Sequence, residues 1–350
     1  MGLVSFYNRS IGLHVWLRFC QYWLFGVLQF KSLNFAVKIK LNVQHCKIDK
    51  METKNFNNNV KGNNSSLISN SVIPQNSPQK IDWNGTPWIE RKPSCPDKVV
   101  TIGTSCSGIG GMEYALQKMG VKTRIEFAGD IDSNVKKSYF ANYDITEDRW
   151  HNDMFTVDTT KYKDRISIFM AGICCTTFSR AGLLRGVEDD TKGKLFKAFC
   201  RIVNECSPKT WVLENVDNML TSNNGRDWRI IKAALDELGY DLHYQVLNAL
   251  DYGVPQNRNR LFVVGFKEPN PDFKFPAPIR LEKSIRDILE DDTPAFRKFT
   301  PRETLRLQGF SDDFKIAVPD YAVLHQAGNS IAVPVLKAIF SQMDITQYGF

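Results

Sequence analysis

Residues 166–179, ISIFMAGICCTTFS, are the stretch that decides the fold of this chain. The first five, Ile166–Met170, form a short apolar run that predicts a buried strand, and two cysteines follow where the strand passes into a loop. In parallel α/β sheets, ligands bind outside the carboxyl ends of the strands. A thiol at this position is therefore a candidate reactive group, and its role depends on what else the chain brings to the same edge.

Strands and helices alternate along residues 98–350. Short apolar runs predict strands at Val99–Gly103, Arg124–Ala128, Ile166–Met170, Thr210–Leu213 and Leu261–Gly265. Helical stretches are expected at Gly110–Met119, Ser133–Asn142, Lys194–Asn204 and Arg226–Leu238. Such alternation indicates an α/β fold with a doubly wound, mostly parallel sheet and right-handed crossovers.

The N-terminal part of the chain differs from the rest in charge and composition. Residues 1–97 carry 12 Lys and Arg against 5 Asp and Glu, whereas residues 98–350 carry 33 of each, so the net charge of +7 lies in residues 1–97. Residues 54–80 are rich in Asn, Ser and Gln, which is typical of a disordered linker. We expect a leader at 1–53, a low-complexity linker and lead-in at 54–97, and one folded domain at 98–350.

The apolar stretch at residues 11–30 raises the question of a membrane anchor. Its longest uncharged run, Phe19–Phe30, has 12 residues, whereas a spanning helix needs roughly 20. A disordered leader, or a mis-assigned one with Met51 as the true start, is therefore favoured over a membrane anchor. The eight cysteines show no CxxC spacing, so the sequence predicts no metal site. Free thiols without a disulfide framework favour a reducing, intracellular setting, either nucleus or cytoplasm.

A glycine-rich loop, residues 104–111 (TSCSGIGG), follows the first predicted strand and opens the first predicted helix. Glycines let a backbone approach a ligand closely, and a helix N-terminus favours a negatively charged group. Asp130 ends the second strand and Asp153 follows a later segment, where the ribose and base of an adenosine would lie. Either aspartate alone is better explained as a helix cap, but the loop and both aspartates together favour an adenosyl cofactor.

A second group of polar residues follows or precedes the later strands. Glu214 ends the strand at 210–213, where its carboxyl can hydrogen-bond a base. Gln256, Arg258 and Arg260 alternate with asparagines, so in an extended segment all three side chains face one side. Two guanidinium groups on one face suit a base oxygen and a phosphate, although a solvated charged edge gives the same pattern.

Together these motifs resemble those of the cytosine-C5 methyltransferase family, and the resemblance covers residues 98–350. The loop Ser107–Gly111 resembles the family's S-adenosylmethionine loop, and Gly172-x-x-Cys175-x-x-Phe178-Ser179 resembles its nucleophile motif. The other motifs follow in family order: Gly182, Gly186, Asp189 and Gly193–Phe196; Glu214–Val216; Gln256–Arg260; Thr300–Glu303 with Leu307–Phe310; and Gln326–Ser330. The resemblance implies a Rossmann-like methyltransferase fold.

The resemblance also implies a reaction, the transfer of a methyl group from S-adenosylmethionine to C5 of a cytosine flipped out of DNA. Cytosine C5 is a poor nucleophile until a group adds at C6, and a thiolate can add there reversibly. The implied catalytic residues are Cys175 as nucleophile, Glu214 as partner of cytosine N3, Arg258 and Arg260. The implied substrate-binding residues are Ser179, Asn215 and Gln256. The implied cofactor-binding residues are Cys106, Ser107, Gly108, Ile109, Gly110, Gly111, Asp130, Ile131, Asp153, Met154, Gly172, Leu195, Asn329 and Ser330.

Three positions depart from the family pattern. Cys174 and Thr176 stand where the family usually has Pro and Gln around the nucleophile, and Cys106 replaces an aromatic residue. Loss of the proline frees the backbone before the thiol and could loosen its placement. Two alternatives therefore stay open. One is a catalytically weak or inactive relative, and the other is transfer to RNA, as in the tRNA-methylating branch of the family.

The largest departure from the family is an absence. Only 39 residues separate Arg260 from Thr300, so the second subdomain is reduced and the recognition region at about 267–299 is short. Lys283–Glu290 is a helix-like stretch, and residues 291–298 then run straight into the next motif. Reading base edges requires an element that enters a DNA groove. The sequence therefore predicts weak target recognition, with a partner chain as a possible source of it.

Removal of residues 1–80 is expected to leave folding and cofactor binding intact, because this composition cannot build a core. Soluble expression and cooperative thermal unfolding of the truncated chain test this. If the cationic leader also contributes to nonspecific DNA affinity, truncation should reduce the salt dependence of binding. An insoluble truncated chain would show instead that the leader packs onto the body.

Overall fold

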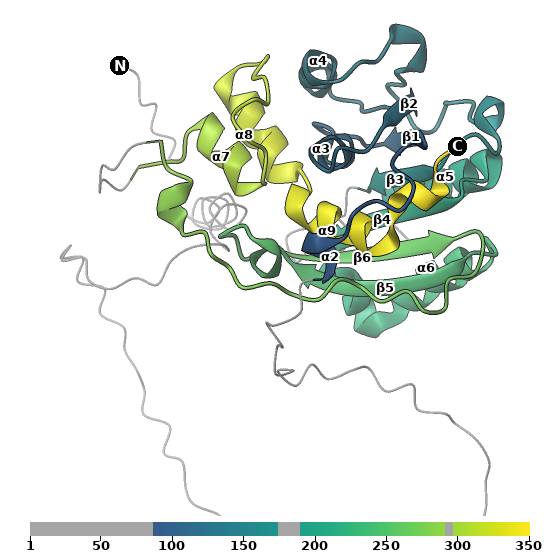
Figure 1. Ribbon diagram of the computed structural model, residues 1–350. Coiled ribbons are helices and arrows are strands. Elements are labelled where there is room, and N and C mark those ends of the chain that lie inside the picture. The colour runs from purple at the N-terminus through teal and green to yellow at the C-terminus, as the bar shows by residue number, and fades with distance from the viewer. Residues whose placement is uncertain (1–86, 174–189, 291–296) are drawn as a thin grey trace, which may run out of the picture. The chain divides into compact units, whose positions relative to one another are not determined.

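A computed structural model describes residues 87–173, 190–290 and 297–350, all of which belong to one compact unit. A six-stranded sheet runs through it in the order β2-β1-β3-β4-β6-β5 (Figure 1). The strands are β1 Val100–Ser105, β2 Thr123–Phe127, β3 Ile168–Gly172, β4 Thr210–Val216, β5 Asp241–Asn248 and β6 Asn259–Phe266. All five strands expected from the apolar runs are present, and β5 is an additional edge strand.

The sheet is mostly parallel, as expected. Neighbouring strands in the series β2-β1-β3-β4 pair in parallel, whereas β6 pairs antiparallel with both β4 and β5. Only β6 therefore runs against the other five strands. As a consequence, the first residues of β6 lie beside the carboxyl ends of the parallel strands, the edge at which such sheets bind ligands.

Helices cover both faces of the sheet. The helices are α2 Pro87–Glu90, α3 Gly111–Lys118, α4 Ser133–Asn142, α5 Asp190–Cys206, α6 Arg226–Asp236, α7 Pro301–Leu307, α8 Asp320–Asn329 and α9 Val333–Met343. The expected helix at Lys283–Glu290 is wrong, because only the single 3-10 turn Ile285–Asp287 forms there. Within the described residues, no helix is long and apolar enough to cross a membrane.

The side chains of the central strands alternate between two apolar clusters. In β3, Ile168 and Met170 belong to the cluster that includes α3 and α9, whereas Phe169 and Ala171 belong to the cluster that includes α5 and α6. Successive residues of a strand point to opposite faces. A strand buried on both faces is apolar at every position, which explains the continuous apolar runs in the sequence. Figure 1 shows α3 and α9 on one side of the sheet and α6 on the other.

The lead-in to the folded domain packs onto it from Pro87 onward. Trp88 in α2 is buried in the cluster with α9, and its carbonyl accepts a hydrogen bond from Ser341 Oγ. The backbone of Val99 then exchanges hydrogen bonds with that of Phe350, at 3.0 and 3.1 Å. These contacts join the start of the described body to its C-terminus.

One buried carboxylate binds both ends of a short segment at the position where the family's recognition region is expected. Glu303 of α7 accepts hydrogen bonds from the backbone N–H of Glu290 (2.9 Å) and from both terminal nitrogens of Arg297 (2.7 and 2.8 Å). Its other contact, with the backbone of Thr300, is half of a capping box that starts α7. Arg297 holds the pKa of Glu303 at about 2. Glu303 thus fixes both ends of the segment between Glu290 and Arg297.

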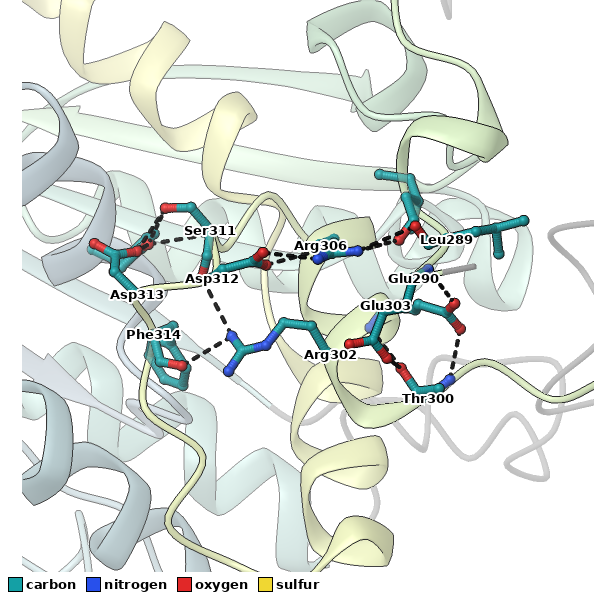
Figure 2. A network of polar contacts seen from close by, with 12 residues as sticks. Leu289, Glu290, Thr300, Arg302, Glu303, Arg306, Ser311, Asp312, Asp313 and Phe314 are labelled. Carbon is teal, nitrogen blue, oxygen red and sulfur yellow. Dashed lines mark hydrogen bonds and ion pairs between the residues drawn. The ribbon is translucent and has the colours of Figure 1, made fainter. Parts of the chain in front are cut away.

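Two arginines of α7 make further polar contacts with neighbouring segments, as Figure 2 shows. Arg306 makes two 2.8 Å hydrogen bonds to the carboxylate of Asp312 and also donates to the carbonyl of Ile288 (3.0 Å). Arg302 donates to the carbonyl of Phe314 (2.9 Å). The two arginines therefore hold the segments before and after α7 against the helix.

A glycine in β6 makes room for the largest fully buried side chain. Gly265 lies opposite Trp211 of β4, and a Cβ atom built on Gly265 would lie 2.2 to 2.5 Å from atoms of the Trp211 indole. The indole Nε1 is buried without a hydrogen-bond partner among the described residues. The tryptophan thus fills the space left by the absent side chain, a pairing that stabilises glycine in a strand.

Gly265→Ala is therefore expected to reduce the free energy of unfolding by about 1–3 kcal/mol through overpacking. In a Trp211→Phe background, the same change should reduce it by about 1 kcal/mol less, because the clashing atoms are gone. Urea unfolding of the four proteins in this cycle measures the coupling. Equal effects of Gly265→Ala in both backgrounds would show that Trp211 is not the obstacle.

Candidate active site

The parallel pairing of β3 and β4 places two predicted site residues side by side. Gly172 at the end of β3 is the register partner of Glu214 in β4, and a Cβ atom on Gly172 would lie 3.5 Å from Glu214 Oε2. The predicted nucleophile Cys175 comes three residues after Gly172. Cys175, Ser179 and the neighbouring residues 174–189 lie outside the described residues. The structure therefore gives the position of Glu214 and of the strand that leads to the thiol.

Glu214 is buried and paired with a cation. Its Oε1 lies 3.0 Å from Arg260 Nε, and the side chains of Glu214 and Arg260 are 11% and 24% exposed. Burial raises the pKa of the Glu214 carboxyl, and the Arg260 and Arg258 guanidinium groups only partly offset this. Arg260 occupies Oε1, while Oε2 faces Gly172. The carboxyl can thus hold a proton more readily than an exposed glutamate.

Arg258 and Gln256 turn toward the C-terminal ends of α8 and α7. Arg258 Nη2 donates to the carbonyls of Gly328 (3.1 Å) and Ser330 (2.8 Å), and Gln256 Nε2 donates to the carbonyl of Leu307 (3.0 Å). The residues at 256, 258 and 260 are half-buried while Asn257 and Asn259 are exposed. The alternation expected from the sequence is therefore confirmed, although the three side chains contact different partners.

The segment after α8 touches both the glycine-rich loop and the end of β3. A Cβ atom on Gly111 would lie 3.4 Å from the carbonyl oxygen of Ile331 and 3.7 Å from Ser330 Oγ, and one on Gly172 would lie 3.7 Å from Ile331 Cδ1. Arg258 holds this segment through its two carbonyl contacts. Residues far apart in sequence thus meet at the carboxyl edge of the sheet.

The glycine-rich loop is joined to the segment after β2. Asp130 Oδ2 accepts a hydrogen bond from the backbone N–H of Gly108 (3.1 Å), and Oδ1 accepts from that of Asp132 (3.0 Å). Ser107 Oγ contacts the backbone of Gly129 through both its carbonyl (3.0 Å) and its N–H (2.9 Å). Burial raises the pKa of Asp130. These bonds fix the loop and the predicted ribose-binding carboxylate relative to one another.

Tyr139 of α4 and Tyr143, the residue just after that helix, support the loop and the start of α3, and neither was singled out from the sequence. Tyr143 donates from its hydroxyl to the carbonyls of Ile109 (3.0 Å) and Gly110 (2.6 Å). Gly110 has a φ of 76°, and a Cβ atom there would lie 2.3 Å from the Tyr143 ring, so only glycine fits. Tyr139 donates to Glu113 (2.6 Å), a fully enclosed carboxyl whose pKa is raised by burial. No sequence pattern marks these residues, since their role depends on tertiary contacts.

The other predicted residues have three kinds of environment: some pack with apolar residues, some bind nearby backbone, and some lie at the surface. The sulfur atoms of Cys106, whose φ is 49°, and Met154 are 3.7 Å apart. Met154 belongs to the apolar cluster with α5 and α6, and Leu195 packs against that cluster. Asp153 and Asn215 accept hydrogen bonds from nearby backbone N–H groups of Phe155 and Val216. Asn329 contacts His325, whereas Ile131 is 86% exposed.

Comparison with solved structures identifies the fold class. The Dnmt2 methyltransferase of S. pombe is similar with a TM-score of 0.55 and 20% identity, over 69% of this chain and 97% of that protein. The Entamoeba histolytica methyltransferase EhMeth is similar with a TM-score of 0.58 and 16% identity, over 71% and 99%. The fold is that of a Rossmann-like methyltransferase.

Comparison of sequences identifies the family. The sequence profile of the C-5 cytosine-specific DNA methylases matches residues 105–295 and 292–344. Type II methyltransferase M.SsoII of Shigella sonnei is 32% identical over 297 residues, covering 67% of this chain and 77% of that protein. M.NgoBI of Neisseria gonorrhoeae is 33% identical, covering 66% and 89%. The chain belongs to the C-5 cytosine-specific DNA methylase family, and it is a DNA cytosine-5-methyltransferase.

Arg260→Met is expected to raise the pKa of Glu214 further, because it removes the nearest cation. A raised folded-state pKa contributes stability below the ordinary glutamate pKa and loses it as pH rises through the folded-state value. The variant should therefore lose about 2 kcal/mol of unfolding free energy at about pH 8 and clearly less at about pH 5. Urea unfolding across this range tests it. In a Glu214→Gln background the pH dependence of the loss should vanish, and its persistence there would contradict the assignment.

Proposed function

We propose that Cys175 attacks C6 of a cytosine flipped out of DNA and that Glu214 supplies the proton partner at N3. The observation that carries the proposal is the position of the buried Glu214. One of its carboxylate oxygens is paired with Arg260, and the other lies beside Gly172. Two residues, Ile173 and Cys174, separate Gly172 from Cys175. A thiol and a carboxyl that reach the same base from adjacent strands are the pair that this reaction needs.

The raised pKa of Glu214 suits its proposed role. Cytosine N3 accepts a hydrogen bond, so its partner must be a donor, and a protonated carboxyl is one. As the Cys175 sulfur bonds to C6, the C5–C6 double bond shifts to C4–C5 and the electrons of the C4–N3 double bond move onto N3, where a proton from Glu214 neutralises the charge. Arg260 on the other oxygen keeps the carboxyl oriented. Once C5 carries the methyl group, the C4–N3 double bond re-forms and the proton returns to Glu214. Loss of the C5 proton to water then expels the Cys175 sulfur and restores the C5–C6 double bond.

The residues around the glycine-rich loop fit S-adenosylmethionine. Asp130 lies beyond the second strand and is tied to the Gly108 backbone, where a carboxylate can accept hydrogen bonds from ribose hydroxyls. Ile131 beside it is 86% exposed, and an adenine ring would cover such an apolar side chain. Asn329, Ser330 and Gly111 complete the proposed site from the other side. The bound cofactor would supply the methyl group for C5.

Cys175→Ser is expected to abolish methyl transfer, whereas Cys174→Ala should leave it largely intact, because only one of two neighbouring side chains can face the base. Transfer from tritiated S-adenosylmethionine to DNA and, in parallel, to tRNA measures both variants and separates the two polymers. DNA containing 5-fluorocytosine should trap the wild-type enzyme covalently through Cys175, since C5 then cannot lose its proton. An active Cys175→Ser variant with an inactive Cys174→Ala variant would reverse the assignment.

We further propose that the recognition domain is reduced to the short segment between Glu290 and Arg297. The family match is divided into two pieces that meet at residues 292–295, within this segment. The alignment with M.SsoII spans 297 positions but only 67% of 350 residues, about 235, so about 62 positions have no counterpart here. Glu303 binds both ends of the segment. A separate partner chain could supply the missing recognition surface.

The isolated chain is expected to methylate DNA weakly within a context of about one or two flanking bases, because each bidentate base contact contributes only about 1–3 kcal/mol of discrimination. Bisulfite sequencing of DNA from cells expressing the chain reports activity and sequence context together. Methylation by the purified chain confined to a fixed site of about four or more bases would contradict the proposal, and the segment at 283–298 or residues 1–97 would then read the groove.

A further inference from the structure

A cavity of about 620 Å³ lies away from the predicted catalytic residues. It is bounded by α2, by the C-terminal end of α3, by α9 and by the turn at residues 252–254. None of the residues that line it belongs to the predicted cofactor, base or nucleophile sites. Its size lies within the range of small-molecule sites, roughly 300–1,000 Å³.

Five cations line this cavity, namely Arg91, Lys92, Lys118, Lys283 and Lys337. The only acidic residue in its lining is Asp344, whose two carboxylate oxygens already accept hydrogen bonds from Ser94, Thr346 and Gln347. Residues 87–350, which include all five cations, carry 35 basic and 35 acidic residues. The convergence of cations is therefore a local feature of this cavity and does not follow from the composition of the body.

Lys337 is the cation that most requires a partner. It is half-buried in α9, and neither Lys337 nor Lys283 has a hydrogen-bond or ion-pair partner among the described residues. Burial lowers the pKa of Lys337, and the ammonium groups of Lys118 and Lys283 lower it further. Lys118 is itself bound to Asp313 at 2.6 Å. A half-buried ammonium group that faces other cations is unfavourable unless an anion joins it.

The walls of the cavity limit what that anion can be. Buried apolar side chains, among them Trp88, Val254 and Phe340, line the cavity together with the five cations. A small molecule with an apolar or aromatic body and a multiply charged group fits both kinds of lining. The part of the chain before the cavity wall is excluded on charge, because residues 1–86 carry 10 basic and 3 acidic residues, a net charge of +7.

We propose that this cavity binds a small phosphorylated ligand of about nucleotide size, with its phosphates on Lys337, Lys283 and Lys118 and its body against Trp88 and Phe340. Lysine ammonium groups bind phosphate as point charges, and several around one group give it both affinity and salt sensitivity. The cavity also adjoins two helices, α3 and α9, that begin beside the proposed cofactor loop. The ligand site is thus separate from the active site but connected to it through rigid elements.

The proposal is tested by calorimetric titration of the full chain with ATP and with inorganic tripolyphosphate. Both should bind saturably, and Lys337→Met and Lys283→Met should each weaken both by about tenfold, the effect of one lost charge contact. The exposed Lys274, which does not line the cavity, provides the matched control Lys274→Met, which should bind as the wild type does. Thermal unfolding without ligand shows whether each variant is folded, and Lys283 is exposed, so at least that variant should fold normally.

Three further results would overturn the proposal. Citrate that binds as tightly as tripolyphosphate would show a general anion site without preference for phosphate. A single-stranded oligonucleotide that competes with ATP and depends equally on Lys337 would assign the site to nucleic acid backbone. Equal affinities of Lys337→Met, Lys283→Met and Lys274→Met for ATP would show that the cavity cations do not bind it.

Discussion

The parallel register between β3 and β4 is the constraint on which the active site depends. It sets Gly172 against Glu214, so the strand that leads to the thiol ends beside the residue that carries the carboxyl. The reversed direction of β6 then adds Arg260 from the other side, because Val216 and Arg260 are register partners. An acid, a cation and a nucleophile-bearing strand are brought together by backbone pairing before any side chain is considered.

The buried carboxyl groups of this protein differ in environment and therefore in protonation. The Glu303 carboxylate is held by Arg297 and by the backbone N–H groups of Glu290 and Thr300, and its pKa falls to about 2. Glu113 accepts hydrogen bonds from the hydroxyl groups of Thr104 and Tyr139 and has no cationic partner among its described contacts, and burial raises its pKa. Glu214 lies between these cases, since burial raises its pKa while two arginines oppose the rise. A permanently charged carboxylate suits a structural junction, whereas one that can gain and lose a proton suits catalysis.

Much of this architecture could be predicted from sequence. The physical reasons why some elements were predictable also explain why others were not. Strands buried on both faces are continuously apolar, so β1, β3, β4 and β6 were visible as short apolar runs. The edge strand β5 is mostly half-buried or exposed and has no such run. The capping box of Ser284 and Asp287 starts one turn. No helix continues from it, because the backbone N–H of Glu290 is hydrogen-bonded to the carboxylate of Glu303. Tyr143 and Glu113 act through partners distant in sequence, which no local pattern reveals.

The double attachment of Glu303 has a consequence for the evolution of such enzymes. Because Glu290 and Arg297 are held to one carboxylate, the chain between them begins and ends at fixed neighbouring points, whatever its length. Lengthening a closed loop from six residues to about a hundred adds only about 2–3 kcal/mol of closure entropy. A lineage can therefore discard or acquire a whole DNA-reading module at this seam while the catalytic body folds unchanged.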